Sequence, residues 1–190
     1  MERSGPGWTE GLSRFSRRHA LVALLVVSGS VNLGLAQQLS YLTARTGSPL
    51  APGTQVPSVS GESLSGSVSI TYPSAAPVLL YYFSPECSWC RRNWDNLRVL
   101  ANAVQGRFRL VALSTLPRPS EEVRRRLSGF EVLWNFSQDA RSAYRLGGTP
   151  MTVVVSADGK VLKAWTGAFQ GRVEREIESY FNVDLPGLTR

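Results

Sequence analysis

Uncharged and apolar positions follow one another without interruption near the start of the chain. No charged residue occurs from Ala20 to Ala44, and the first part of this stretch is almost entirely aliphatic. A helix of about 20 residues crosses the apolar core of a bilayer. The pattern therefore predicts either a membrane anchor or a signal peptide, for which Gly34-Leu35-Ala36 offers a cleavage site of small residues.

The segment before this stretch is basic, because arginines outnumber acidic residues there. Positively charged flanks stay on the cytoplasmic side, so we expect a cytoplasmic tail over residues 1–19 and the anchor or signal peptide over residues 20–44. Residues 20–42 would contact the membrane. Glycine, proline and small polar residues mark 45–52 as a linker, which leaves residues 53–190 for one folded domain beyond the membrane.

Strand and helix patterns alternate after the linker. Short β patterns at Val56–Ser60 and Ser67–Tyr72 precede Pro77–Phe83, a continuous apolar run that is typical of a strand buried on both faces. Apolar residues then recur at helical spacing in Ser88–Gln105. The remaining predicted elements are strands at Phe108–Ser114, Val132–Phe136, Met151–Ser156 and Lys160–Thr166 and helices at Pro119–Leu127, Gln138–Leu146 and Gln170–Phe181.

This order of elements predicts the fold class. Strands separated by helices need parallel crossover connections, whereas the turn Ala157-Asp158-Gly159 joins two antiparallel strands. We therefore expect an α/β fold with a mixed central sheet flanked by helices, preceded by extra N-terminal strands and the membrane helix.

Composition and charge remove several classes of function. The chain has 21 Lys and Arg against 14 Asp and Glu, but the basic residues are scattered and form no stripe interleaved with aromatics. We therefore expect no nucleic-acid partner. The single histidine, His19, lies in the basic tail, and a zinc site usually needs four protein ligands. No metal site is expected.

The candidate reactive side chains lie in Cys87-Ser88-Trp89-Cys90, a segment at a predicted strand-to-helix junction that contains both cysteines of the chain. Two intervening residues in a first helical turn let both sulfurs approach bonding distance. Cys87 lies at the helix N-terminus, where unpaired N–H groups favour a thiolate, so it is the predicted nucleophile. Cys90 lies on the apolar stripe and is the predicted buried resolving thiol.

These features resemble the thioredoxin superfamily. The apolar strand, the cysteine pair, the segment Gly148-Thr149-Pro150 and the hairpin that follows it are most similar to membrane-anchored thiol–disulfide oxidoreductases of the TlpA and ResA type. The resemblance implies a thioredoxin fold over about Gly53 to Phe181. It also implies that Pro150 is a cis-proline that positions the substrate and that the Thr149 backbone pairs with an extended substrate segment.

The same resemblance implies an activity. The protein would exchange disulfides with protein partners outside the cytoplasmic membrane, without a cofactor, and a membrane or periplasmic donor would recycle its Cys87/Cys90 redox-active pair. A reductant of the cytochrome c maturation type is expected, while an oxidase or isomerase would use the same residues. A copper-binding metallochaperone is the alternative from another class. The domain would lie in the periplasm or outside the cell, anchored by one membrane span or secreted after signal cleavage.

Some positions depart from the family pattern. Glu86 stands where many reductive thioredoxins have tryptophan, and Trp89 stands between the cysteines instead. Tyr81 would align with the buried acid of thioredoxin, so a carboxylate proton acceptor is missing there. We expect Glu86, Trp89 and Thr149 to contact the substrate, although Trp89 could instead pack against the edge of the sheet.

Overall fold

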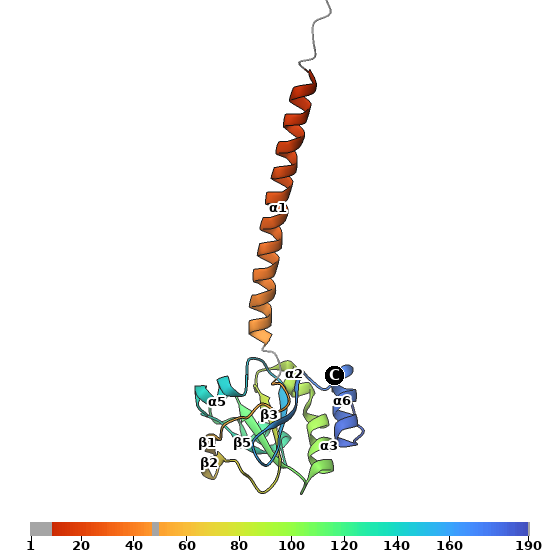
Figure 1. The fold of residues 1–190 in the computed structure, drawn as a ribbon. Coiled ribbons are helices and arrows are strands. Elements are labelled where there is room, and N and C mark those ends of the chain that lie inside the picture. Colours follow the sequence, from red (N-terminus) through yellow and green to blue (C-terminus); the bar gives the residue numbers. More distant parts are fainter. Residues whose placement is uncertain (1–8, 47–49, 190) are drawn as a thin grey trace, which may run out of the picture. The chain divides into compact units, whose positions relative to one another are not determined.

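The computed structural model describes residues 9–46 and 50–189, and the chain divides into two compact units, Met1–Ala44 and Arg45–Arg190. Most of the first unit is helix α1, Thr9–Thr46 (Figure 1). The helix begins inside the segment predicted as a tail, because no proline interrupts the sequence over this span. Its window Leu21–Gln38 is long and apolar enough to cross a membrane, a test that a signal sequence also passes.

The second unit is built on a mixed five-stranded sheet with the strand order β5-β4-β3-β6-β7. Strands β3, β4 and β5 are parallel, whereas β6 is antiparallel to both of its neighbours, β3 and β7. The predicted mixed α/β sheet is therefore confirmed. The strands are β3 Val78–Phe83, β4 Arg109–Ser114, β5 Glu131–Leu133, β6 Met151–Val155 and β7 Val161–Thr166.

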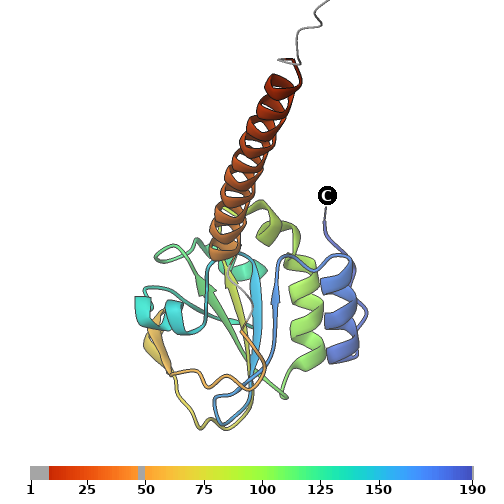
Figure 2. The same cartoon turned by 45° about the horizontal axis from the view of Figure 1, so that its top comes forward.

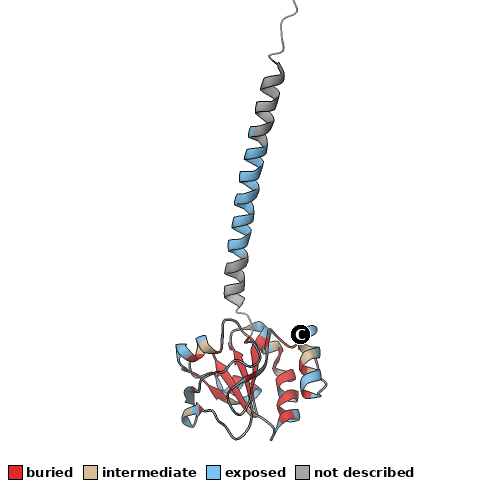
Figure 3. Ribbon diagram, in the orientation of Figure 1, coloured by how far each residue is buried: buried red, intermediate tan, exposed pale blue. Residues whose placement is uncertain are grey.

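Helices cover both faces of this sheet. Helices α3 and α6 lie side by side against one face, and α5 lies on the other (Figures 1 and 2). All six residues of β3 are buried, as the continuous apolar run predicts, and buried residues gather on the sheet and on the inner side of α3 (Figure 3). The helices are α2 Ser88–Arg92, α3 Trp94–Val104, α4 Glu121–Arg126, α5 Gln138–Ala143 and α6 Arg172–Phe181.

The N-terminal strands form a separate antiparallel hairpin of β1, Val59–Ser63, and β2, Gly66–Ile70. The prediction that the first strand begins at Val56 is wrong. Gln55 instead makes an isolated bridge with Lys160, and the Val56 N–H donates to the Gly159 carbonyl at 2.9 Å. This segment therefore pairs with the distant β6–β7 hairpin before β1 begins.

The prediction of one continuous helix over Ser88–Gln105 is also wrong, because the helix breaks at Asn93. The Asn93 N–H donates to the carbonyl of Cys90, three residues back, at 3.2 Å, which is the tighter spacing of a 3₁₀ turn. Its side-chain Oδ1 accepts the backbone N–H of Phe169 at 3.1 Å. The buried amide thus fixes the break, and Cys90 lies on a short helix, α2, that Cys87 caps.

Candidate active site

Both cysteines lie at the junction between β3 and α2. Cys87 is the N-cap of α2, and its Sγ accepts the backbone N–H of Cys90 at 3.3 Å. Cys87 is partly exposed, whereas Cys90 is fully buried, and the structure holds both as free thiols. The difference in exposure predicted from helical spacing is therefore present: the Cys87 side chain is partly accessible to solvent, and the Cys90 side chain is not.

The other side of the site is formed by Thr149 and Pro150, which immediately precede β6. The Thr149–Pro150 peptide bond is cis, as the resemblance implied, and Pro150 is buried. The Cys87 thiol donates to the Thr149 carbonyl oxygen across 3.6 Å. The Pro150 carbonyl accepts the N–H of Gly167 at 2.8 Å, which fixes this side of the site to the end of β7. The sulfur of Cys87 therefore faces the backbone of Thr149.

The two thiols have opposite acidities. Partial burial raises the pKa of Cys87, but hydrogen bonds from Cys90, from the Thr149 side chain and from the Trp89 backbone outweigh that effect, and its pKa is lowered overall. Burial, together with the adjacent Cys87, raises the pKa of Cys90 to about 12. At neutral pH the nucleophilic form of sulfur is therefore concentrated on the exposed cysteine.

The charged residues beside Cys87 do not point at its sulfur. The Arg91 guanidinium donates to the backbone carbonyls of Pro85 at 3.3 Å and Glu86 at 3.2 Å, and the Glu86 side chain is exposed. Arg91 thus stabilises the loop that leads into α2. The lowered pKa of Cys87 comes chiefly from hydrogen bonds rather than from a neighbouring cation.

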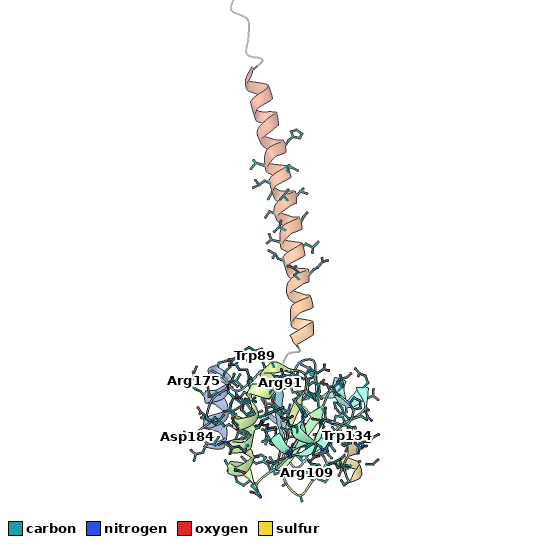
Figure 4. The ribbon with its side chains drawn as sticks, turned by 180° about the vertical axis from the view of Figure 1, so that it is seen from behind. Trp89, Arg91, Arg109, Trp134, Arg175 and Asp184 are labelled. Carbon is teal, nitrogen blue, oxygen red and sulfur yellow. The ribbon has the colours of Figure 1, made fainter. Side chains whose placement is uncertain are left out.

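Trp89 presents its ring beside the site and is 44% exposed. The Arg92 guanidinium carbon lies 4.9 Å from the ring centroid, a cation–π distance. Arg92 Nε donates to the Thr189 carbonyl at 2.8 Å, and the Thr189 backbone N–H and hydroxyl both donate to the Arg92 carbonyl at 3.0 Å. The C-terminal segment therefore holds Arg92 in place, a contact that no sequence pattern indicated. Figure 4 labels Trp89 and Arg91 at the same end of the domain.

A group of buried polar side chains lies under Cys90. Asn93 Nδ2 donates to the Tyr81 hydroxyl at 3.4 Å, and Asn93 Oδ1 accepts Asn96 Nδ2 at 3.0 Å. All three residues are fully buried. In the helix predicted over Ser88–Gln105, Asn93 falls between Cys90 and Leu97 on the apolar face, where a solvated residue is not expected, and this was the signal in the sequence.

The site offers few donors to a metal. Within residues 9–46 and 50–189, no group of three or more His, Cys, Asp or Glu side chains is arranged to hold an ion. A soft metal at this site would have the two sulfurs of Cys87 and Cys90 as its protein ligands.

Comparisons with known proteins show which family the domain belongs to. A family model described as a thioredoxin-like domain matches residues 70–177, more than half of the chain. The thioredoxin domain of a thiol-disulfide oxidoreductase from Bacteroides vulgatus is similar at 26% identity and a TM-score of 0.54, over 70% of this chain and 99% of that chain. No curated protein sequence matches.

Two further solved structures bear on the fold alone, because their identity is below 25%. A thiol:disulfide interchange protein from Bacteroides sp. has 24% identity and a TM-score of 0.54, over 70% of this chain and 91% of that chain. A thio-disulfide isomerase from Thermus thermophilus has 21% identity and a TM-score of 0.52, over 72% of this chain and 100% of that chain.

Proposed function

The chain belongs to the thioredoxin-like family, and from this premise we propose that it reduces disulfides of protein partners outside the cytoplasmic membrane. One observation carries the proposal. The partly exposed sulfur of Cys87, whose pKa is lowered, faces the Thr149 carbonyl, while the sulfur of Cys90 is buried next to it. An attacking thiolate and a shielded second thiol are what disulfide exchange requires.

The reaction proceeds in two exchanges. The Cys87 thiolate attacks one sulfur of the substrate disulfide, which forms a mixed disulfide and releases the other substrate sulfur as a thiolate that takes up a proton. Cys90 then attacks the Cys87 sulfur, so that the bond to the substrate breaks and the Cys87–Cys90 disulfide forms. Two electrons pass from the protein to the substrate, and a membrane or periplasmic dithiol donor restores the pair.

Substrate binding is assigned to the surface around Cys87. An extended segment of the partner would pair with the Thr149 backbone, in the manner of an added β-strand, with Pro150 holding that backbone in position. The exposed ring of Trp89 would contact an apolar side chain of the partner, and Glu86 would face its flank.

The direction of electron flow and the location complete the proposal. We assign the reducing direction, with disulfide-bonded apocytochrome c as the substrate class, and we place the domain in the periplasm or outside the cell, behind an α1 that spans the membrane once. Cleavage of α1 as a signal sequence would instead release a secreted domain. Oxidation or isomerisation uses the same residues and differs in the reduction potential of the pair.

A direct test is reduction of a disulfide-bonded protein. The full chain in detergent, supplied with dithiothreitol, should accelerate the reduction of insulin, whose freed B chain precipitates and scatters light. Cys87→Ser should abolish the acceleration, whereas Ser58→Ala, an exposed change outside the site, should leave it intact. Wild-type protein that adds nothing to the rate with dithiothreitol alone would contradict the proposal.

A further inference from the structure

The segment of residues 182–189 returns from the end of α6 to the helix that carries the active site. The Leu185 backbone N–H donates to Glu178 Oε1 at 3.0 Å, and the Leu185 side chain packs against the core, so this part of the segment is held on α6. Farther along, the Thr189 backbone N–H and hydroxyl both donate to the Arg92 carbonyl at 3.0 Å. The segment therefore links α6 to the last residue of α2.

The same segment fixes the guanidinium of Arg92. Arg92 Nε donates to the Thr189 carbonyl at 2.8 Å, and the guanidinium carbon lies 4.9 Å from the centroid of the Trp89 ring. Trp89 and Arg92 are three residues apart, so they lie on the same side of α2. Arg92 is half-buried, whereas Trp89 is exposed. A long and flexible cation is thus held in one place beside an exposed aromatic ring.

Part of the Arg92 guanidinium remains available to a ligand. Arginine has five N–H donors on a planar fork, which matches the two oxygens of a carboxylate. The Nε donor is bound to Thr189. Within residues 9–46 and 50–189, Nη1 and Nη2 make no hydrogen bond or ion pair with another residue. The terminal donors of the fork can therefore bind a carboxylate from outside.

Arg92 is close enough to Cys87 to meet residues beside the substrate cysteine. Arg92 follows Cys87 by five residues along α2. A helix rises about 1.5 Å per residue, so the two are separated by about 7 Å along the helix axis. An extended chain advances about 3.3 Å per residue. When Cys87 attacks a substrate cysteine, a side chain about two residues away from that cysteine can therefore reach Arg92.

The other charges near Cys87 differ from Arg92 in their contacts. The Arg91 guanidinium donates to the backbone carbonyls of Pro85 and Glu86, which stabilises the loop. The side chain of Glu86, the residue before Cys87, is exposed. The chain thus carries an anion immediately before Cys87 and a fixed cation at Arg92, after it. A charge preference for substrates should therefore depend on the side of the substrate cysteine.

We propose that Arg92 is a specificity-determining residue, which binds a carboxylate side chain near the reacting disulfide of the protein substrate and is positioned by Thr189. This inference rests on the proposed function. It makes disulfides with a neighbouring Asp or Glu the preferred substrate class. Two unit charges about 4 Å apart in water interact strongly enough to change a rate about 5-fold. The exchange of disulfides itself is unchanged.

Peptide probes of matched sequence test this preference. Each probe joins a fluorescent peptide to a quencher through one disulfide and carries a single Glu or a single Lys, placed two residues before or two residues after its cysteine. The reduced full chain in detergent is mixed with each probe, and the initial rise in fluorescence gives the rate. At one of the two positions, the Glu probe should react about 5-fold faster than the Lys probe. Salt at about 1 M should reduce this ratio.

A matched pair of substitutions tests the role of Arg92. Arg92→Gln should lower the ratio of the two rates to below about 2-fold, because the cation is lost. Arg107→Gln removes the same charge from another guanidinium that lies over a ring, 6.0 Å from the Phe108 centroid. Arg107 precedes the start of β4, which runs parallel to β3, so it lies at the edge of the sheet away from Cys87. This control should keep the wild-type ratio.

Two changes at Thr189 test the positioning. Thr189→Pro removes both the N–H and the hydroxyl that donate to Arg92, so the ratio should fall below about 2-fold. Thr189→Ser keeps both donors and should keep the ratio. A wild-type ratio in Thr189→Pro would contradict the positioning role of Thr189.

The outcomes separate this inference from the proposed function. Equal rates for the Glu and Lys probes at both positions would overturn the specificity, as would a wild-type ratio in Arg92→Gln. An equal loss of the ratio in Arg107→Gln would overturn it too, since the effect would then come from net charge. In each case the reduction of the probes by wild-type protein would leave the proposed function intact. Wild-type protein that reduces none of the probes would contradict the proposed function itself.

Discussion

The sulfur of Cys87 lies 3.6 Å from the carbonyl oxygen of Thr149, a residue 62 positions later in the chain. The sheet produces this contact, because β3 runs antiparallel to β6 and pairs Tyr82, near its end, with Met151, at the start of β6. Cys87 follows the end of β3, and Thr149 precedes the start of β6. The register of one strand pair thus places the sulfur of Cys87 beside the Thr149 backbone, to which we assign pairing with the substrate.

The first prediction separates the two cysteines. Cys90→Ser should leave attack by Cys87 intact but block resolution, so that mixed disulfides with a protein substrate accumulate and can be seen on non-reducing gels. Cys87→Ser should yield none, because the remaining thiol is fully buried. Equal trapping by both variants would contradict the assignment of the nucleophile.

The second prediction concerns pH. Alkylation requires the thiolate, and the pKa of Cys87 is lowered, so its alkylation rate should reach half of its maximum at a lower pH than the value of about 8.5 for a free cysteine. The pKa of Cys90 is raised to about 12, so Cys90 should remain unmodified at neutral pH. Mass spectrometry after brief iodoacetamide treatment of the reduced protein checks both statements. Faster labelling of Cys90 than of Cys87 would refute them.

The third prediction tests the buried amide at the helix break. Asn93→Ala leaves the Phe169 N–H without its acceptor, and Asn96 Nδ2 keeps only the Phe169 carbonyl, at 3.4 Å. We expect the free energy of unfolding to fall by about 2–4 kcal/mol, from urea titration of the Arg45–Arg190 unit. Asn102→Ala, at an exposed position of α3, is the control and should change it by less than about 0.5 kcal/mol.

The fourth prediction tests how the N-terminal hairpin packs on the sheet. A Cβ atom at Gly61 would lie 2.8 Å from the Trp134 carbonyl oxygen, a backbone atom that cannot move aside easily. Gly61→Ala should therefore destabilise the domain by about 1–3 kcal/mol. A Cβ at Gly148 would meet nothing within 4 Å, so Gly148→Ala should be nearly neutral in the same urea titration. If both variants lowered the free energy of unfolding by similar amounts, the close approach of Gly61 to the Trp134 carbonyl would not contribute to stability.

Much of the fold could be predicted because its signals are local. The apolar run at β3 and the turn at Asp158-Gly159 each specify one element within a few residues of sequence, and both are found where expected. The cysteine pair could be assigned for the same reason, since spacing within a single helical turn separates an exposed sulfur from a buried one.

Other features could not be predicted because they depend on distant partners. The break at Asn93 is fixed by the backbone of Phe169, 76 residues away, and Thr189 approaches Arg92 from 97 residues away. The late start of β1 likewise reflects pairing of Gln55 with Lys160. Helical periodicity and turn preference carry no information about such contacts, so a helix could be predicted there but not its interruption.

The reduction potential of the Cys87/Cys90 pair tests the central claim most directly. It can be measured by equilibrating the protein in redox buffers of known potential and quantifying the free thiols at each one. A reductant of protein disulfides requires a value near or below about −270 mV, and this is the result that we predict. A value near about −120 mV would contradict the reducing role and assign the same two cysteines to an oxidase.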